Sequence, residues 1–327
     1  MDKAIVITTI NSPRKEITEF AKLKDWTLIC VGDTKTPENW KHENAIYLSP
    51  SDQARLFPKM LLPWNCYARK NIGYLYAIKE GAKVVMDTDD DVFYSSNFPP
   101  DISKNKKVSL IKGRKFINIF EVFGSKTSWP RGFPINYVNH VDSKKELKMT
   151  KENVFAPLQT SLIDDDSDFD AIYRLLYDKR VFFNKTGEYA LAKGSYCPIN
   201  TQNTFSYSEI FPLLYIPAFI NPHVEDIWRG YIAQRLVWEI GGRVVFMHPT
   251  VYTSERNQHD YLKDFEHELP LFLQTNKLVA ILDSLSLGSD LHKSLIKVYE
   301  ELAKEGIMNK SEVAVVTSWI MEIERLS

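Results

Sequence analysis

Four carboxylates stand within five residues of this sequence, at Asp87, Asp89, Asp90 and Asp91. Carboxylates at this density repel one another unless a cation lies between them. Hard divalent cations such as Mg²⁺ bind one or two carboxylates together with phosphate oxygens. The cluster therefore predicts a site for a metal ion and a diphosphate, with Asp89 and Asp91 as metal ligands. An acidic loop or a cluster at a helix N-terminus would give the same residues.

The residues before the cluster favour the metal site over these alternatives. Residues 68–81 have the spacing of a helix with one apolar face, and the helix is expected to stop at Glu80-Gly81. Residues 83–86 form a short apolar run that is typical of a buried parallel strand. In open α/β sheets, ligands bind at the carboxyl ends of such strands. Arg69 and Lys70, at the start of the helix, would add positive charge near a diphosphate.

The N-terminal part of the chain predicts alternating strands and helices. Residues 4–10 and 26–31 are apolar strands, and an amphipathic segment at 14–24 lies between them. A short third strand is expected at 45–48. This order indicates an α/β fold that opens with a parallel sheet. Asp33 follows the second strand, where it fits either a contact to a ribose or base or an ordinary turn.

The middle of the chain contains polar segments with more than one interpretation. Residues 108–111 and 116–118 suggest a hairpin. The loop at 198–204 is dense in amide side chains, which can pair with sugar hydroxyls or simply face solvent. Asp226 stands with Glu225 at the start of a long helix, where it serves as a helix cap or as a general base. Asp166 and Asp168 precede a helix at 171–176 and fit the same capping role.

Residues 253–268 are polar and predict a mobile lid that closes over phosphates. Arg256 would bring positive charge to the donor. His259 is a candidate third metal ligand, although a lone histidine in a polar loop is more commonly solvated, and His248 competes for the same role. From Pro270 onward, three helical segments are expected to complete the chain.

Composition excludes several classes of protein. The net charge of −1 leaves no electrostatic footprint for nucleic acid. The three cysteines, Cys30, Cys66 and Cys197, are too far apart for a zinc knuckle or a disulfide framework. No segment approaches the roughly 20 apolar residues of a membrane span, and the first residues lack a signal-peptide pattern. These features predict a cytoplasmic protein without a membrane span.

Several segments resemble those of the STELLO-type glycosyltransferase-like proteins, in the same order. They are RKNIGYLYAIKEGAK with DTDDD, SWPRGFPI, DSDFDAIYRL, KGSYCPINTQNT, DIWRGYIAQRLVWEIGG, HPTVY and the tail VTSWIMEIERL. The first pair also resembles the ARNxG helix and DxD strand end of GT-A glycosyltransferases. A more distant similarity, in DDDVF, DSDFDA and DIWRGY, is to the reversibly glycosylated polypeptides, which act as UDP-arabinopyranose mutases. Plant STELLO proteins carry a Golgi membrane anchor, whereas this sequence is expected to be a catalytic domain alone.

The resemblance implies a GT-A type, Rossmann-like fold with a mixed central sheet and a C-terminal helical tail. We expect a glycosyltransferase domain at 1–268, with a nucleotide-binding half at 1–100 and an acceptor half at 101–268, followed by a helical extension at 269–327. The implied activity moves a sugar from a nucleotide-diphosphate donor, with a UDP-sugar expected, to a glycan, polysaccharide-precursor or lipid-linked acceptor. Mn²⁺ or Mg²⁺ would be the cofactor. The alternatives are a nucleotide-sugar mutase and a non-catalytic scaffold of the same fold.

The residues and the resemblance together predict the members of each subsite. The predicted donor-binding residues are Thr8, Thr9, Asn11, Asp33, Arg69, Lys70, Asn71, Asp87 and Arg256. The predicted metal ligands are Asp89, Asp91 and His259. The predicted acceptor-binding residues are Asn200, Gln202, Asn203, Glu225 and Trp228. Asp226 is the predicted base if the reaction inverts the anomeric carbon, and an acceptor-binding residue if it retains configuration.

Overall fold

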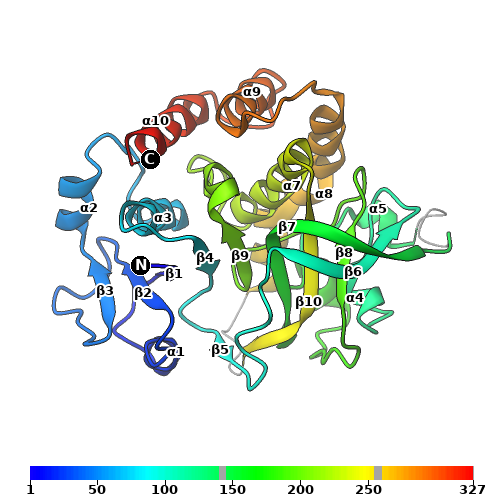
Figure 1. Ribbon diagram of the computed structural model, residues 1–327, viewed down its shortest axis with the longest axis horizontal. Coiled ribbons are helices and arrows are strands. Elements are labelled where there is room, and N and C mark those ends of the chain that lie inside the picture. The colour runs from blue at the N-terminus through cyan, green and yellow to red at the C-terminus, as the bar shows by residue number, and fades with distance from the viewer. Residues whose placement is uncertain (140–144, 254–259, 327) are drawn as a thin grey trace.

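A computed structural model describes residues 1–139, 145–253 and 260–326 (Figure 1). One ten-stranded mixed sheet is packed between helices, and three helices follow the last strand. The predicted α/β class, with a mixed central sheet and a helical C-terminal part, is confirmed. Among the helices that the structure describes, none has both the length and the apolar character needed to cross a membrane.

The bounds of the strands and helices are as follows. The strands are β1 (Lys3–Thr8), β2 (Thr27–Val31), β3 (Ala45–Leu48), β4 (Val84–Asp87), β5 (Phe93–Tyr94), β6 (Asn105–Lys112), β7 (Lys148–Asp165), β8 (Glu188–Leu191), β9 (Thr204–Tyr207) and β10 (Gly242–Thr253). The α-helices are α1 (Lys15–Phe20), α2 (Pro50–Leu56), α3 (Lys70–Lys79), α4 (Ile119–Val122), α5 (Ile135–Val138), α6 (Ala171–Leu176), α7 (Glu225–Val237), α8 (Tyr261–Ser284), α9 (Leu291–Lys304) and α10 (Ser311–Leu326). The 3₁₀ helices within the described residues are η1 (Tyr67–Arg69), η3 (Ser208–Leu214) and η4 (Trp238–Ile240).

The first four strands lie parallel in the order β3-β2-β1-β4. Apolar residues dominate these strands, and most side chains of β1, β2 and β4 are buried, as expected for a sheet covered on both faces, whereas the edge strand β3 is mostly half-buried. The register pairs Thr8 with Val31 and Val6 with Asp87. The carboxyl ends of β1, β2 and β4 therefore meet at one edge of the sheet.

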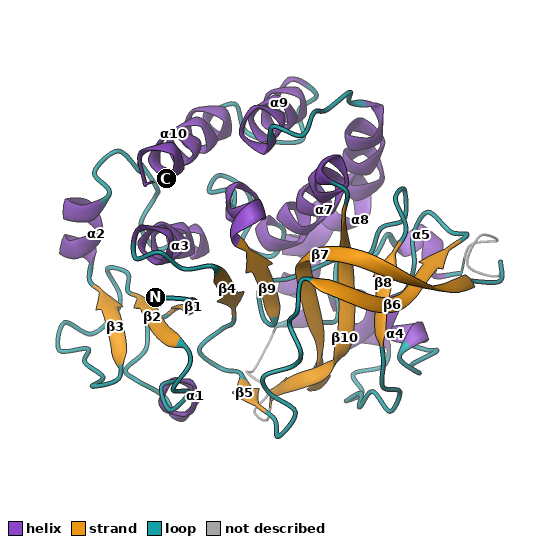
Figure 2. Ribbon diagram, viewed as in Figure 1, coloured by secondary structure: helices purple, strands orange, loops and turns teal. Residues whose placement is uncertain are grey.

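The second half of the sheet is built on the long strand β7. Its first part pairs with β6 and its second part with β10, while β8 pairs with both β6 and β10 (Figure 2). These four strands thus form a closed ring of pairings. The predicted hairpin of 108–111 with 116–118 is wrong, because β6 pairs with β7 and β8 instead. Phe116 forms only a bridge to Tyr196, and its ring packs in an aromatic cluster ahead of α4.

Helix α3 approaches the sheet unusually closely at Gly73. A Cβ at this position would lie 2.5 Å from Cγ1 of Val6 and 2.7 Å from Cγ2 of Val31, so a larger residue would push the helix outward. This packing holds the start of α3, with Lys70, beside the strand ends. Helix α10 packs against α3 and α9, which places the C-terminal helices along one side of the sheet (Figure 1).

The predicted lid at 253–268 is wrong for the residues that the structure describes. Residue 253 ends β10, and residues 261–268 form the first turns of α8. The side chain of Asp260 accepts a hydrogen bond from the Lys263 backbone N–H at 3.2 Å, which is a normal N-terminal cap. Helix α8 continues through Pro270, so the first of the three C-terminal helices begins before the predicted start.

Candidate functional site

A cavity of about 340 Å³ opens where the carboxyl ends of β1, β2 and β4 meet. Its lining includes five of the predicted donor-binding residues, Thr8, Thr9, Asn11, Asp33 and Arg69, together with Asp89, Asp90 and Asp91. The cavity therefore lies at the edge of the sheet where the strand pattern predicted a ligand site.

The three carboxylates in the lining have different surroundings. Asp89 Oδ1 accepts hydrogen bonds from the Tyr67 hydroxyl at 2.7 Å and from Lys70 Nζ at 3.2 Å. Asp90 Oδ2 accepts from the side chains of Thr9 and Asn11 in the loop after β1. Burial, followed by the negative charges of Asp89 and Asp90, raises the pKa of Asp91 to about 6.

Oxygen ligands of this kind fit a hard divalent cation. A cation between Asp89 and Asp91 would relieve the repulsion that raises the pKa of Asp91. The two carboxylates of Asp89 and Asp91 are sufficient to balance the charge of a divalent cation. Asp89 and Asp91 thus offer oxygen ligands for the predicted metal, although among the described residues the acidic segment does not bring three carboxylates within 4.8 Å of one another. The metal stays a prediction.

Asp87 differs from the other carboxylates because it faces into the protein. It is fully buried, its Oδ2 accepts from Arg229 Nη2 at 3.0 Å, and its Oδ1 accepts from the Tyr74 hydroxyl. Lys70 Nζ lies 3.9 Å from Asp87 Oδ1 and also bonds the backbone oxygen of Thr88 at 2.7 Å. Asp87 and Arg229 therefore form a buried ion pair beneath the cavity, not part of its lining.

Arg69 and Asn71 have structural partners that occupy their polar atoms. The guanidinium of Arg69 donates to Gln53 Oε1 at 2.9 Å through Nε and stacks on Trp64 at 3.8 Å, while bordering the cavity. Asn71 is fully buried and exchanges two hydrogen bonds of 2.8 Å with the backbone of Ile216. The structure thus brings Arg69 to the cavity and keeps Asn71 away from it.

Asp33 closes the opposite side of the cavity. Its Oδ1 accepts from the backbone N–H groups of Thr34 at 2.6 Å and Asn65 at 2.9 Å, and its Oδ2 accepts from that of Cys66 at 3.3 Å. Asp33 is therefore both a turn residue and part of the lining. A contact from it to a nucleoside stays a prediction.

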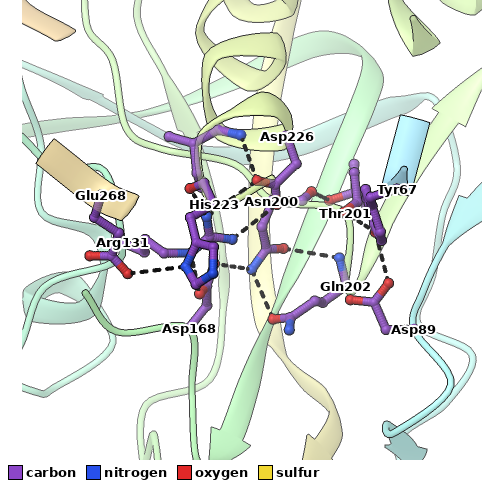
Figure 3. Close-up of polar contacts among 12 residues, drawn as sticks. Tyr67, Asp89, Arg131, Asp168, Asn200, Thr201, Gln202, His223, Asp226 and Glu268 are labelled. Atoms are coloured by element: carbon purple, nitrogen blue, oxygen red, sulfur yellow. Dashed lines mark hydrogen bonds and ion pairs between the residues drawn. The ribbon is translucent and has the colours of Figure 1, made fainter. Parts of the chain in front are cut away.

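A second polar cluster surrounds Asp226 in the first turn of α7. Arg131 donates to both carboxylate oxygens of Asp226, through Nη1 at 3.3 Å and Nη2 at 3.1 Å. The Arg131 Nε donates to Asp168 at 2.7 Å (Figure 3). Burial raises the pKa of Asp226 and the charge of Asp168 acts in the same direction, while Arg131 opposes both.

The amide loop reaches this cluster through two of its predicted residues. Asn200 Nδ2 donates to Asp168 at 2.9 Å and to Gln202 Oε1 at 3.1 Å, and both amide residues are half-buried. The close approach of this loop to α7 requires Gly230, because a Cβ there would lie 2.4 Å from the Ile199 backbone oxygen.

Tyr67 and Thr201 connect the two clusters. Their hydroxyl oxygens lie 2.5 Å apart, and the Tyr67 hydroxyl donates to Asp89. Figure 3 shows the resulting series of polar side chains between Asp89 and the Asp226 cluster. Because Thr201 is next to Asn200 in the chain, the cavity at the strand ends and the predicted base lie in one polar region.

Three predicted acceptor-binding residues are instead inside the protein. Asn203 is fully buried and donates to Thr250 at 3.0 Å, and Trp228 Nε1 donates to Thr275 at 3.2 Å. Glu225 is fully buried, and within the described part of the chain its carboxylate oxygens have no hydrogen-bond partner. Burial and the neighbouring Asp226 raise the pKa of Glu225 well above its usual range.

The sequence assigned no role to Arg131, Tyr67 or Thr201, and for Asp168 it offered helix capping as one interpretation. The cap of α6 is Asp170, whose Oδ1 accepts from the Tyr173 backbone N–H at 2.8 Å. Asp168, two residues earlier, is thereby left to bind Arg131. The segments SWPRGFPI and DSDFDAIYRL contained the signal, since both resemble segments of the STELLO-type proteins.

Two predicted residues, Arg256 and His259, lie outside the described residues. His248, the competing metal ligand, is half-buried within β10.

Comparison with known proteins agrees with the sequence motifs. A family model described as STELLO glycosyltransferases matches residues 223–327. Two proteins of Arabidopsis thaliana, named "Probable glycosyltransferase STELLO2" and "Probable glycosyltransferase STELLO1", are each 28% identical to this chain over 349 aligned residues. Each alignment covers 98% of this chain and 44% of the relative, so the chain spans less than half the length of these relatives. The matches show that the chain is similar to the STELLO-type glycosyltransferases along nearly its whole length.

Proposed function

We propose that this chain transfers a sugar from a nucleotide-diphosphate donor, with a UDP-sugar expected, to a glycan or polysaccharide-precursor acceptor. The observation that carries the proposal is the cavity at the strand ends, whose lining includes Asp89 and Asp91. Asp89 contacts Tyr67, which contacts Thr201, and the neighbouring residue of that loop, Asn200, contacts the Asp226 cluster through Asp168. The names of the two similar Arabidopsis proteins, both probable glycosyltransferases, support glycosyl transfer as the class of reaction.

On the donor side, Asp89 and Asp91 would hold Mn²⁺ or Mg²⁺. When bound, such an ion neutralises the charge that develops on the departing diphosphate. Lys70 contributes a fixed ammonium group at the same place, because its Nζ lies 3.2 Å from Asp89 and its side chain is fully buried. Thr8, Asn11 and Asp33 would contact the nucleoside and its phosphates from the other walls. Arg256 remains a proposed further cation for the diphosphate.

On the acceptor side, Asp226 is the proposed base for an inverting transfer. Arg131 fixes its orientation, and burial raises its pKa toward the pH at which a carboxylate accepts a proton efficiently. Asn200 and Gln202, held beside Asp168, would bind hydroxyls of the acceptor. In a retaining enzyme, Asp226 would bind the acceptor without removing its proton.

A thermal-shift panel of nucleoside diphosphates, with and without Mn²⁺, tests the donor site. We expect one diphosphate to raise the melting temperature only with Mn²⁺, since a ligand at 100 times its Kd stabilises a fold by about 2.7 kcal/mol. Asp89→Asn should lose this gain. Asp2→Asn is the matched control, because Asp2 is an exposed carboxylate at the opposite end of β1. A panel without any metal-dependent gain would contradict the donor site.

The same purified protein separates transfer from the two alternatives. Ring interconversion of the bound nucleotide sugar without an acceptor would identify a mutase. If Asp89→Asn left the biological function intact, the fold would be a scaffold. We expect neither result, and expect the nucleoside diphosphate to be released in step with glycosylation of an acceptor.

A further inference from the structure

A second group of metal-binding side chains lies next to the Asp226 cluster. The ligand atoms of His223, Asp264 and His267 all lie within 4.8 Å of one another. Asp264 and His267 are three residues apart on α8, so they share one face of that helix. His223 comes two residues before the start of α7. All three side chains are half-buried, which leaves a path from solvent.

The ring of His223 is oriented by two carboxylates. Its Nε2 lies 3.9 Å from Asp264 Oδ1, and its Nδ1 lies 3.9 Å from Glu268 Oε1 (Figure 3). Metal-bound histidines commonly present their second ring nitrogen to a carboxylate in this manner. Glu268 is suited to that role because it is buried, and because its Oε2 is fixed by the Ala171 backbone N–H at 2.8 Å.

The spacing suits a small transition-metal ion. Zinc–ligand distances of about 2.0–2.1 Å in a tetrahedral site place neighbouring ligand atoms roughly 3.4 Å apart. The gap of 3.9 Å between His223 and Asp264 exceeds this separation only slightly, so small side-chain rotations would close it. The imidazole rings of His223 and His267 already lie 5.1 Å apart between their centres.

We propose that His223, Asp264 and His267 bind a transition-metal ion of the Zn²⁺ type at a site separate from Asp89 and Asp91. Two imidazoles and one carboxylate favour such an ion over Mg²⁺, which prefers oxygen ligands. Three protein ligands also leave a fourth position for water. The site goes beyond the proposed transferase activity and shares no residue with the donor cavity.

The position of the site gives the ion a structural role. The His223 backbone oxygen accepts a hydrogen bond from Arg131, the residue that holds Asp226. An ion bound to His223 and to two residues of α8 would join the start of α7 to α8. His223 is then a positioning residue for Arg131 and Asp226, not a catalytic residue.

Titration of metal-free protein with Co²⁺, without nucleotide, tests the site directly. We expect one equivalent to bind with a visible absorption band of low-coordinate Co²⁺, and Zn²⁺ to displace it. His267→Ala and His223→Asn should each abolish the band. Glu268→Gln keeps the acceptor for Ala171 and should weaken binding by about 10–100-fold.

Two variants serve as controls in the same titration. His292 is a half-buried histidine on α9 whose ring pairs with Glu324 at 3.1 Å, so His292→Ala should leave the band unchanged. Asp89→Asn should also leave it unchanged, and its loss there would assign the ion to the donor site. Melting curves of the metal-free variants confirm that each is folded. Absence of stoichiometric binding to the unmodified protein, or a band that survives in folded His267→Ala and His223→Asn, would overturn the proposal.

Discussion

Arg131 binds both carboxylate oxygens of Asp226, at 3.3 and 3.1 Å, and holds Asp168 with its remaining nitrogen at 2.7 Å. The three residues come from a loop after α4, from the start of α7 and from the turn after β7. One buried guanidinium therefore fixes two carboxylates from distant parts of the chain. This arrangement places Asp226 beside the amide loop. Burial raises the pKa of Asp226, and the positive charge of Arg131 lowers it.

Removal of the Arg131 charge should change the pH dependence of transfer. Arg131→Gln leaves Asp226 buried without its cation, so the pKa of Asp226 rises further. A base acts in its deprotonated form, and the acidic limb of the rate profile should therefore move to higher pH. Arg131→Lys keeps the charge and should shift the limb less. Arg131→Gln should also lower the free energy of unfolding by about 3–5 kcal/mol, because it leaves a buried carboxylate without its partner. An unchanged acidic limb in folded Arg131→Gln would contradict the role of Asp226 as base.

Asp87 and Asp89 should behave differently although they are two residues apart. Asp87→Asn leaves Arg229 buried without its carboxylate partner, while Lys70 keeps Asp89 at 3.2 Å, and should lower the free energy of unfolding by about 3–5 kcal/mol. Asp89→Asn should cost much less stability but abolish Mn²⁺-dependent donor binding. Chemical denaturation and calorimetry of both variants measure the difference. Equal losses of stability would show that the two carboxylates are not divided between fold and ligand.

Asp91→Asn should stabilise the protein without metal, and only at neutral pH. Burial raises the pKa of Asp91 to about 6 from a usual value of 3.8, so the folded state must hold an unfavourable charge above that pH. Stability of the unmodified protein therefore falls as pH rises from about 4 to 6 relative to the variant. We expect the variant to be more stable by about 2–3 kcal/mol at pH 7.5 and by nothing at pH 4.

The same variant should bind the donor more weakly with Mn²⁺, because it lacks a metal ligand. Denaturation curves at the two pH values, with and without Mn²⁺ and UDP, measure both effects. A variant that was less stable than the unmodified protein at pH 7.5 would refute this account of Asp91.

Gly230→Ala should damage the acceptor side of the site without affecting the donor side. Its new Cβ would lie 2.4 Å from the Ile199 backbone oxygen, which cannot rotate away as a side chain can. We expect a loss of about 1–3 kcal/mol in stability and weaker acceptor binding, with UDP binding unchanged. Gly288→Ala is the matched control, since nothing lies within 4 Å of its added Cβ. Calorimetry with UDP and kinetics with an acceptor check both parts.

Periodicity and strand composition were sufficient to predict the first half of the fold. Residues 4–10, 26–31, 45–48 and 83–86 each correspond to a parallel strand, and the helix before Glu80-Gly81 ends as expected. The predicted hairpin of 108–111 with 116–118 was wrong because β6 pairs with β7 and β8, which are distant in sequence. The local sequence pattern carries no information about such partners. The lid failed because the cap at Asp260 begins a helix whose first turns are polar on the exposed side.

The members of the candidate site were predictable where residues directly follow strand ends. They were less predictable where a side chain is either buried or lines the cavity, because the sequence does not show which. Asp89, Asp91, Thr8 and Asn11 do line the cavity, while their roles stay predictions. Asp87 looks identical to its neighbours in sequence, yet it is the last residue of β4, is fully buried and pairs with Arg229. Arg131 could not be assigned because its partners lie 37 and 95 residues away along the chain.

Calorimetric titration of UDP into the protein, with and without Mn²⁺, tests the central claim most directly. The account predicts binding at one site per chain that is strengthened by Mn²⁺, lost in Asp89→Asn and retained in Asp2→Asn. The metal-dependent gain should decrease below pH 6, where protonation of Asp91 competes with the ion. Mn²⁺-independent UDP binding that is equal in Asp89→Asn and the unmodified protein would contradict a metal–diphosphate site at the end of β4.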